Sequence, residues 1–242
     1  MRELTPAELL RLYESGSTEA PLERAVGILA AACPETNPDQ IAALSAGRRD
    51  GLLLELRALN FGPRAECVAE CPTCGSELEF ALELTDIASH GPAAPRPDST
   101  EIEGFEIRLR LPDTRDLMAA SATGSVEAAR AVLLERCVAA RRGQEIVAAR
   151  DLPAQLIAAI VEEMSRLDPQ ADVLLALRCA ACGHAWDAPF DISSFLWNEI
   201  QQAARKLLRG VHVLASAYGW SEADILSLSP WRRQAYLGMV TE

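Results

Sequence analysis

Cys71-Pro-Thr-Cys74-Gly75 and Cys179-Ala-Ala-Cys182-Gly183 repeat one pattern, in which two cysteines are separated by two residues and followed by glycine. This spacing lets a single turn direct both sulfurs to the same point, and four thiolates at about 2.3 Å suit tetrahedral zinc. The glycine allows positive φ, so that backbone N–H groups face the sulfurs. The two stretches together predict one structural zinc ion with Cys71, Cys74, Cys179 and Cys182 as its ligands.

The two halves of this predicted site are far apart in the chain. Residues 75–178 separate them, a distance of 104 residues, whereas simple zinc ribbons use about 15 to 20. Closing such a loop costs roughly 4 kcal/mol, and structural zinc contributes on the order of 10 to 16 kcal/mol. Alternating apolar residues flank each knuckle, at residues 65–84 and 172–190, and predict a hairpin with the knuckle at its tip. The sequence therefore favours a split zinc ribbon.

Other interpretations of these cysteines stay open: a redox dithiol pair, two separate sites completed elsewhere, or reduced cysteines without metal. A thioredoxin-like motif begins a helix, whereas strand-like alternation follows Cys74 and Cys182. His184 is an alternative ligand, but the four cysteines already complete the shell, so we expect it at the flank of its knuckle. A closed shell leaves no open position for catalysis.

Composition restricts the partners and the compartment. The chain of 242 residues carries 23 basic and 35 acidic residues, a formal net charge of −12, which argues against general affinity for nucleic acid or anionic membranes. No apolar run reaches 18 residues and the first residues lack a signal-peptide pattern, so we expect a cytoplasmic protein without membrane insertion. Seven cysteines, an odd number, fit a reducing compartment. We expect Cys67 to be a buried strand residue.

Hydrophobic periodicity predicts an α+β protein, mostly helical, with a central split zinc-ribbon-like antiparallel β element and helical N- and C-terminal regions. Thr5-Pro6-Ala-Glu8 and Asn37-Pro38-Asp-Gln40 are helix-start signals. The predicted regions are an N-terminal helical region at 1–62, the first ribbon half plus an extra strand at 63–112, a helical insertion at 113–170, the second ribbon half at 171–192, and a long helix with a helical hairpin tail at 193–242.

Three finer expectations concern the middle of the chain. Residues 90–97 are rich in proline and predict a loop or linker. Residues 105–111 alternate apolar and charged side chains, which predicts a strand that joins the ribbon sheet. Residues 126–141 predict a single helix after a Gly124-Ser125 cap.

Catalytic motifs are missing from the sequence. It contains no Gly-x-Ser-x-Gly elbow, no phosphate-binding glycine loop and no His-Glu-x-x-His helix. None of its histidines, His90, His184 and His212, stands in the sequence context of a catalytic nucleophile. We therefore expect no catalytic residues, no small-molecule substrate and no enzymatic activity.

The predicted helical pair at the C-terminus has two interpretations. It has the outline of a helix-turn-helix, so the alternative function is a cytoplasmic zinc-ribbon regulator or adaptor that binds nucleic acid or protein through this pair. A recognition helix should be basic, but this one has only Arg232 and Arg233. Large aromatic residues are common interface anchors. The predicted partner-binding residues are Tyr218, Trp220, Trp231, Arg232, Arg233 and Tyr236.

Several ordered segments carry a resemblance to a known family. They are Gly47-Arg-Arg-Asp50-Gly-Leu-Leu-Leu-Glu-Leu-Arg57 with Phe61-Gly62, the two knuckles, Phe105-Glu-Ile-Arg-Leu-Arg-Leu-Pro-Asp-Thr-Arg-Asp-Leu117, and His212-Val-Leu-Ala-Ser-Ala-Tyr-Gly-Trp220-Ser-Glu-Ala-Asp-Ile-Leu226 with Arg232-Arg-Gln-Ala-Tyr236. Together they resemble the baseplate hub and hub-assembly chaperone family of T-even-type phages, in the longer bacterial form found with contractile injection systems.

The resemblance implies a non-enzymatic structural or chaperone-like assembly component of a baseplate hub. Its implied partners are baseplate, hub, tube or spike proteins of the same phage tail-like apparatus. The two knuckles and the long insertion distinguish this chain from the shorter phage members of the family. Whether the protein stays in the finished particle or acts only during assembly is left open.

Overall fold

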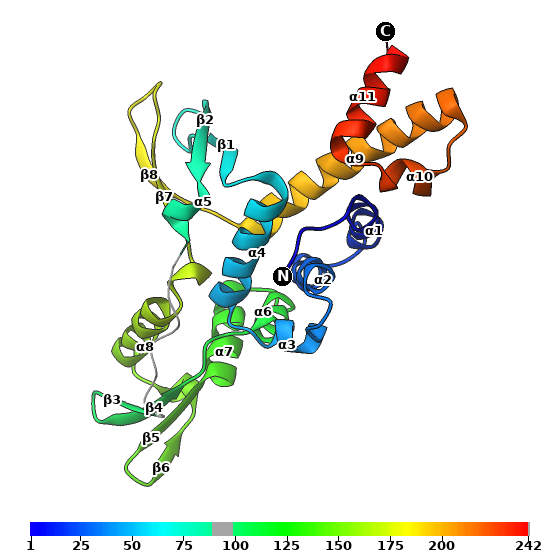
Figure 1. Ribbon diagram of the computed structural model, residues 1–242. Coiled ribbons are helices and arrows are strands. Elements are labelled where there is room, and N and C mark those ends of the chain that lie inside the picture. Colours follow the sequence, from blue (N-terminus) through cyan, green and yellow to red (C-terminus); the bar gives the residue numbers. More distant parts are fainter. Residues whose placement is uncertain (89–98, 242) are drawn as a thin grey trace. The chain divides into compact units, whose positions relative to one another are not determined.

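The computed structural model describes residues 1–88 and 99–241, and the chain divides into two compact units (Figure 1). Unit 1 comprises Met1–Pro34 and Ser193–Glu242, and unit 2 comprises Glu35–Ile192. Helices predominate and the strands form small antiparallel sheets, which confirms the predicted α+β class with helical ends. The loop predicted at residues 90–97 lies outside the described residues. The five predicted regions stay a prediction, and region 1–62 contributes helices to both units.

Unit 1 is helical. Its elements are α1 (Pro6–Gly16), α2 (Pro21–Ala32), α9 (Ile192–Tyr218, all but its first residue), α10 (Glu222–Ser227) and α11 (Pro230–Thr241). The predicted capping box begins α1, because the Glu8 N–H donates to the Thr5 hydroxyl at 3.3 Å and the Thr5 N–H donates to the Glu8 carboxylate at 2.9 Å. The 27 residues of α9 span about 40 Å, which confirms the predicted long helix.

A close approach between α1 and α9 requires glycine at position 16. A Cβ at Gly16 would lie 2.7 Å from Cη2 of Trp197, so a larger side chain would clash. The Arg24 guanidinium lies 4.4 Å from the centre of the Trp197 ring. The same guanidinium donates to the carbonyls of Gly16 at 2.8 Å and Glu19 at 2.9 Å. These contacts join α1, α2 and α9 through one cation–π pair and its hydrogen bonds.

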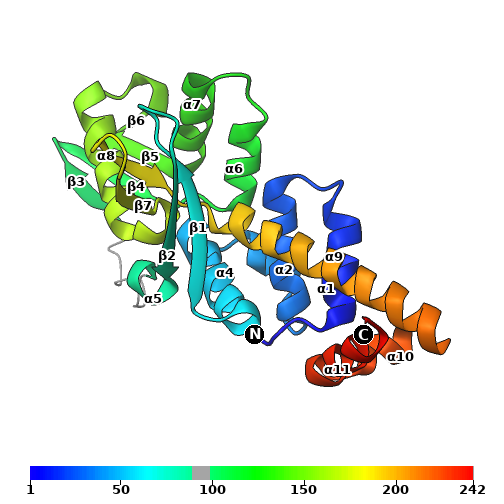
Figure 2. The same cartoon turned by 90° about the horizontal axis from the view of Figure 1, so that it is seen from above.

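The tail after α9 forms the predicted helical pair. The Asp224 N–H donates to the Ser221 hydroxyl at 3.2 Å, which caps the start of α10. Leu214 of α9 and Ile225 of α10 are fully buried against each other. The α11 side chains that pack against this pair are Tyr236, Leu237 and Val240. Both views of the molecule place α10 and α11 beside the C-terminal half of α9 (Figures 1 and 2).

Unit 2 combines short helices with three antiparallel sheets, in the strand orders β1-β2, β3-β4-β5-β6 and β7-β8. Its strands are β1 (Arg64–Glu70), β2 (Glu77–Glu83), β3 (Thr100–Ile102), β4 (Phe105–Leu109), β5 (Val138–Arg142), β6 (Glu145–Val147), β7 (Leu174–Arg178) and β8 (Ala185–Pro189). Its helices are α3 (Pro38–Ala42), α4 (Ala46–Phe61), α5 (Leu84–Ile87), α6 (Thr114–Ser121), α7 (Val126–Cys137) and α8 (Ala154–Leu167), with 3-10 turns at Ala149–Asp151 and Pro169–Ala171.

The middle of unit 2 corrects two predictions. The strand predicted to join the ribbon is β4, which pairs instead with β3 and β5 in a separate sheet. The helix predicted to run to Arg141 ends at Cys137, and the chain continues as β5. The helix-forming residues 139–142 are extended because β4 and β6 pair with β5 on its two sides, and tertiary pairing outweighs local propensity. Gly143, with φ of 61°, makes the turn into β6.

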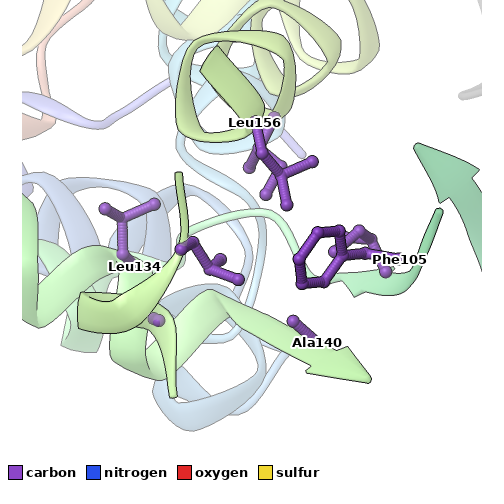
Figure 3. Close-up of a cluster of buried hydrophobic side chains, with 8 residues drawn as sticks. Phe105, Leu134, Ala140 and Leu156 are labelled. Atoms are coloured by element: carbon purple, nitrogen blue, oxygen red, sulfur yellow. The ribbon is translucent and has the colours of Figure 1, made fainter. Parts of the chain in front are cut away.

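The four-stranded sheet has a hydrophobic core of its own (Figure 3). Phe105 of β4 and Ala140 of β5 lie in one buried cluster with Leu134 of α7 and Leu156 of α8. Leu156 is fully buried, as is Ile160 one helical turn later. Apolar burial therefore holds this sheet against its helices.

A buried carboxylate joins the start of α6 to the end of α7. The Asp116 side chain is 1% exposed and pairs with Arg110 and with Arg136, whose Nε donates to it at 2.7 Å. The Asp113 N–H also donates to Asp116, at 3.0 Å. Burial raises the pKa of Asp116, but the two guanidinium groups and this N–H outweigh burial and hold the pKa below its usual range.

Candidate metal centre

The first knuckle lies at the tip of the β1-β2 hairpin, and α4 fixes where that hairpin begins. The buried Arg57 of α4 donates to the carbonyls of Gly62 at 2.7 Å and Arg64 at 2.8 Å, on both sides of the turn that leads into β1. At the far end, Glu70 pairs with Glu77, which leaves residues 71–76 as the connection. Cys67 of β1 is buried, as predicted.

The second knuckle has the same position in the β7-β8 hairpin. Arg178 pairs with Ala185, so residues 179–184 form the connection. At the open end of the hairpin, the Phe190 N–H donates to the Val173 carbonyl at 2.9 Å. The structure thus confirms the two predicted hairpins, each as a two-stranded sheet with a cysteine pair at its tip.

The backbone of the two knuckles is nearly identical. In the first, the Cys71 N–H donates to the Ser76 carbonyl at 2.9 Å, and the Gly75 N–H donates to the Cys71 carbonyl at 2.9 Å. In the second, the Cys179 N–H donates to the His184 carbonyl at 2.8 Å, and the Gly183 N–H donates to the Cys179 carbonyl at 2.9 Å. Both glycines have positive φ, 69° and 75°. This is the turn that the Cys-x-x-Cys-Gly pattern predicts.

The four sulfur atoms come together although their two halves are distant in sequence. All four Sγ atoms lie within 4.8 Å of one another. Two distances cross between the knuckles, 3.7 Å from Cys71 to Cys182 and 3.6 Å from Cys74 to Cys179. A tetrahedron with metal–sulfur bonds of about 2.3 Å has edges of about 3.8 Å. The four cysteines therefore form a potential single zinc site, to which each hairpin contributes two ligands.

Burial and charge within the cluster also suit a metal. Cys71 and Cys179 are 1% exposed, whereas Cys74 and Cys182 are exposed. Hydrogen bonding to the Ser76 hydroxyl, 3.3 Å away, and to its backbone lowers the pKa of Cys74 to about 6. At Cys182 the His184 backbone lowers the pKa, but desolvation and the neighbouring sulfurs raise it to about 12. Four thiolates at such distances need a cation, which a divalent metal would supply.

The residues around the cysteine cluster do not add a further metal ligand to it. Among the residues that the structure describes, the cysteine cluster is the one group of histidine, cysteine or acidic side chains with metal-binding spacing. The His184 ring stacks on Trp186 instead, with ring centres 5.9 Å apart and an angle of 12° between the planes. His184 thus flanks the knuckle, as expected. Sequence reasoning missed the contribution of Ser76, whose only signal is its place two residues after Cys74.

The predicted partner-binding residues of the tail differ in their surroundings. Tyr218, Trp220 and Tyr236 contact one another, with ring centres 4.7 to 5.8 Å apart, so these rings mainly stabilise the tail itself. Trp231, by contrast, is 78% exposed, and Arg232 is exposed beside it. The remaining residue of the predicted set, Arg233, is buried.

The site and the fold define an α+β protein with a potential metal site, formed where two cysteine hairpins meet across a long insertion. Residues 6–197 match the family described as T4 bacteriophage base plate protein. Because this match covers most of the chain, including all four cysteines, the chain belongs to that family of phage baseplate proteins. No curated protein and no solved structure matches the chain.

The family indicates a structural or assembly role through contacts with other baseplate components. In the described part of the chain, the helices are too short or too polar to cross a membrane.

Proposed function

We propose that the protein is a zinc-stabilised, non-enzymatic component of the baseplate hub of a phage-like contractile injection apparatus, where it acts as a structural or chaperone-like assembly factor. The observation that carries this proposal is the family match, which spans both knuckles. The protein works by binding baseplate, hub, tube or spike proteins of the same apparatus, and it is assembled in the cytoplasm.

Zinc has a structural role in this proposal. Cys71 and Cys74 would hold it from one hairpin and Cys179 and Cys182 from the other, so that a single ion joins segments separated by residues 75–178. When bound, the ion supplies positive charge and tetrahedral geometry. Its four protein ligands leave no position for a substrate, which supports binding as the function and opposes catalysis.

The tail geometry weakens the alternative function, a regulator that binds nucleic acid through its C-terminal helical pair. A basic recognition helix needs several exposed cations along one face. In α11, Arg233 is buried, which leaves Arg232 as the exposed arginine. One phosphate contact contributes little to affinity at physiological salt.

Co-purification tests the proposal. The full-length zinc-loaded protein is mixed with purified hub, tube and spike proteins of the same apparatus, and complexes are separated by size-exclusion chromatography. We expect a complex with at least one of the three, and we expect duplex DNA at about 150 mM salt to leave the elution unchanged. If the protein bound DNA and none of the three proteins, the regulator would replace the hub component. If the protein is found in finished particles, it is a resident component. If it is absent from them, it is an assembly chaperone.

A further inference from the structure

One face of α9 is basic, although the chain as a whole is acidic. Residues 201–221 contain no aspartate or glutamate, whereas the chain has a formal net charge of −12. Arg205, Arg209 and His212 follow one another at spacings of four and three residues, so they lie on one face of the helix. All three are exposed, and so is Lys206 at the border of this face. These four residues form the basic strip of α9.

The side chains of the basic strip point into solvent. None of the ion pairs identified within residues 1–88 and 99–241 includes Arg205, Lys206 or Arg209. The Arg209 Nε donates to the Arg205 carbonyl of the same helix at 3.4 Å, which neutralises neither charge. Exposed cations can stay solvated, so the strip indicates a binding partner only if a complementary surface exists.

The outer face of the β1-β2 hairpin is such a surface. Alternate residues of both strands are exposed, and the strand register places them side by side on one face of the hairpin. Arg64 is the basic residue among these positions, and it pairs with Glu66 at 3.0 Å. The acidic residues of this face are Glu66, Glu70, Glu77, Glu79 and Glu83. This set is the acidic face of the hairpin.

The two surfaces agree in the spacing of their charges. Residues i and i+4 of an α-helix are about 6 Å apart along its axis, and residues i and i+2 of a strand are about 6.7 Å apart. Arg205 and Arg209 of α9 can therefore face the successive carboxylates Glu77 and Glu79 of β2 at the same time.

The composition of the two surfaces also agrees. Glu70 lies directly opposite Glu77 in the hairpin, and such a like-charged pair is destabilising unless a cation approaches it. Each surface includes an exposed apolar side chain. Val68, opposite Glu79, is 64% exposed, and Leu208, beside the basic strip, is 41% exposed. Apolar contact between them would add to the attraction of the charges.

We infer that the basic strip of one copy binds the acidic face of a second copy of this chain. The inference goes beyond the proposed function and does not depend on it. A second copy is favoured as the partner because the structure itself contains the complementary surface. A single exposed ion pair contributes little, so the contact depends on several pairs. The net charge of −12 opposes association, but charges beyond about 8 Å are screened at physiological ionic strength, so the facing surfaces dominate.

This contact joins two different surfaces, so it is heterologous. A bound pair leaves a free acidic face on one copy and a free basic strip on the other, to which further copies can add. Heterologous contacts of this kind produce closed rings or open chains. We therefore expect assemblies larger than a dimer as the protein concentration rises.

Sedimentation velocity of the full-length zinc-loaded protein tests the inference. We expect reversible self-association at micromolar concentrations and about 50 mM salt, weakened at least tenfold at about 500 mM. Arg205→Glu with Arg209→Glu makes the strip acidic, and Glu77→Lys with Glu79→Lys adds cations to the hairpin. Each double variant alone should self-associate at least tenfold more weakly, because like charges then face each other.

A mixture of the two double variants gives the decisive result. Each variant then meets surfaces of opposite charge on the other, so an equimolar mixture should associate again. General attraction between the two proteins cannot explain this rescue, because each pair of reversals changes the net charge of −12 by four and both variants stay negative.

Controls separate the two surfaces from net charge and from folding. Arg48→Glu with Arg130→Glu, and Glu127→Lys with Glu135→Lys, produce the same changes in net charge at exposed positions of α4 and α7. Both controls should self-associate like the unmodified protein. Zinc content and melting temperature should be unchanged in all four double variants, since the substituted side chains are exposed.

The other results would overturn the inference. An unmodified protein that stays monomeric at about 50 mM salt would do so and would leave the proposed function untouched. Self-association that neither reversal weakens, or a mixture that stays monomeric, would also contradict it. If Arg205→Glu with Arg209→Glu abolished binding to hub, tube or spike proteins, or to duplex DNA, and left self-association intact, the strip would face that other partner instead of a second copy.

Discussion

The knuckle hairpins and the four-stranded sheet stabilise short strands in two different ways. In β2, β7 and β8, exposed residues alternate with half-buried ones, so these strands bury little apolar surface. The sheet of β3 to β6 instead packs against helices through eight buried residues. A two-stranded hairpin alone is marginally stable in water. The difference fits the proposal that a metal on the four sulfurs stabilises the hairpins, whereas the sheet has a core of its own.

Metal removal should produce the largest difference in stability between the knuckle hairpins and the four-stranded sheet. We expect chelation to release the hairpins, since structural zinc contributes on the order of 10 kcal/mol. Hydrogen exchange should then lose protection at residues 64–83 and 174–189, while residues 105–109 and 138–142 keep theirs. Equal loss in both regions would show that the sheet also depends on the metal, and no loss in either would show that the metal does not stabilise the hairpins.

A cavity in the sheet core should have the converse effect. Leu156→Ala removes a fully buried side chain of α8 and should cost about 2 to 5 kcal/mol of unfolding free energy. Zinc content, measured after dialysis, should stay the same. Val161→Ala on the same helix is the control, because Val161 is 42% exposed and its truncation should change stability by less than about 1 kcal/mol. A loss of zinc in Leu156→Ala would mean that the two regions are not independent.

The buried ion pair beside the sheet should show a pH-dependent effect of smaller size. Asp116→Asn keeps the shape of the side chain but removes the charge that Arg110 and Arg136 neutralise, and it should cost about 2 to 4 kcal/mol at pH 7. The folded-state pKa of Asp116 is lowered, so its contribution is present above the unfolded value of about 3.9 and is lost as the pH falls below it. The stabilities of the two proteins, taken from denaturation curves, should converge as the pH falls below about 4. A difference that stayed constant throughout the acid range would contradict this origin.

The smallest effect expected is at the knuckle turn. Gly183 has φ of 75°, and a Cβ added to it would meet no described atom within 4 Å, so Gly183→Ala introduces backbone strain without a clash. We expect a cost of about 1 to 2 kcal/mol, seen as weaker zinc binding in a competition titration. Gly124→Ala, where space is open and φ is not positive, should leave zinc affinity unchanged. Equal affinity for Gly183→Ala would show that this turn tolerates a side chain.

Much of the fold could be predicted because its signals are local. Thr5 with Glu8, and Ser221 with Asp224, mark helix starts through hydrogen bonds between residues three apart, and the structure contains both. The knuckles could be predicted because cysteine spacing and glycine position encode the turn directly. That the two pairs meet follows from metal chemistry, which prefers four sulfur ligands to two.

The sequence predictions that the structure corrects failed because contacts between distant parts of the chain decide these features. Residues 139–142 are good helix formers, but they form β5 because β4 lies beside them, although α6 and α7 separate the two strands in the chain. Because β4 pairs with β3 and β5, it does not belong to the ribbon. The burial of Arg233 could not be predicted either, because it depends on the tertiary packing of the tail rather than on a local sequence signal.

Native mass spectrometry of the purified protein counts metal ions per chain and so tests whether the two hairpins share one zinc ion. We expect one zinc ion per chain, lost completely in Cys71→Ser and in Cys179→Ser, since each hairpin supplies two of the four sulfurs. A folded protein without metal, two zinc ions per chain, or a full complement of zinc retained by either variant would contradict a single site shared between the hairpins.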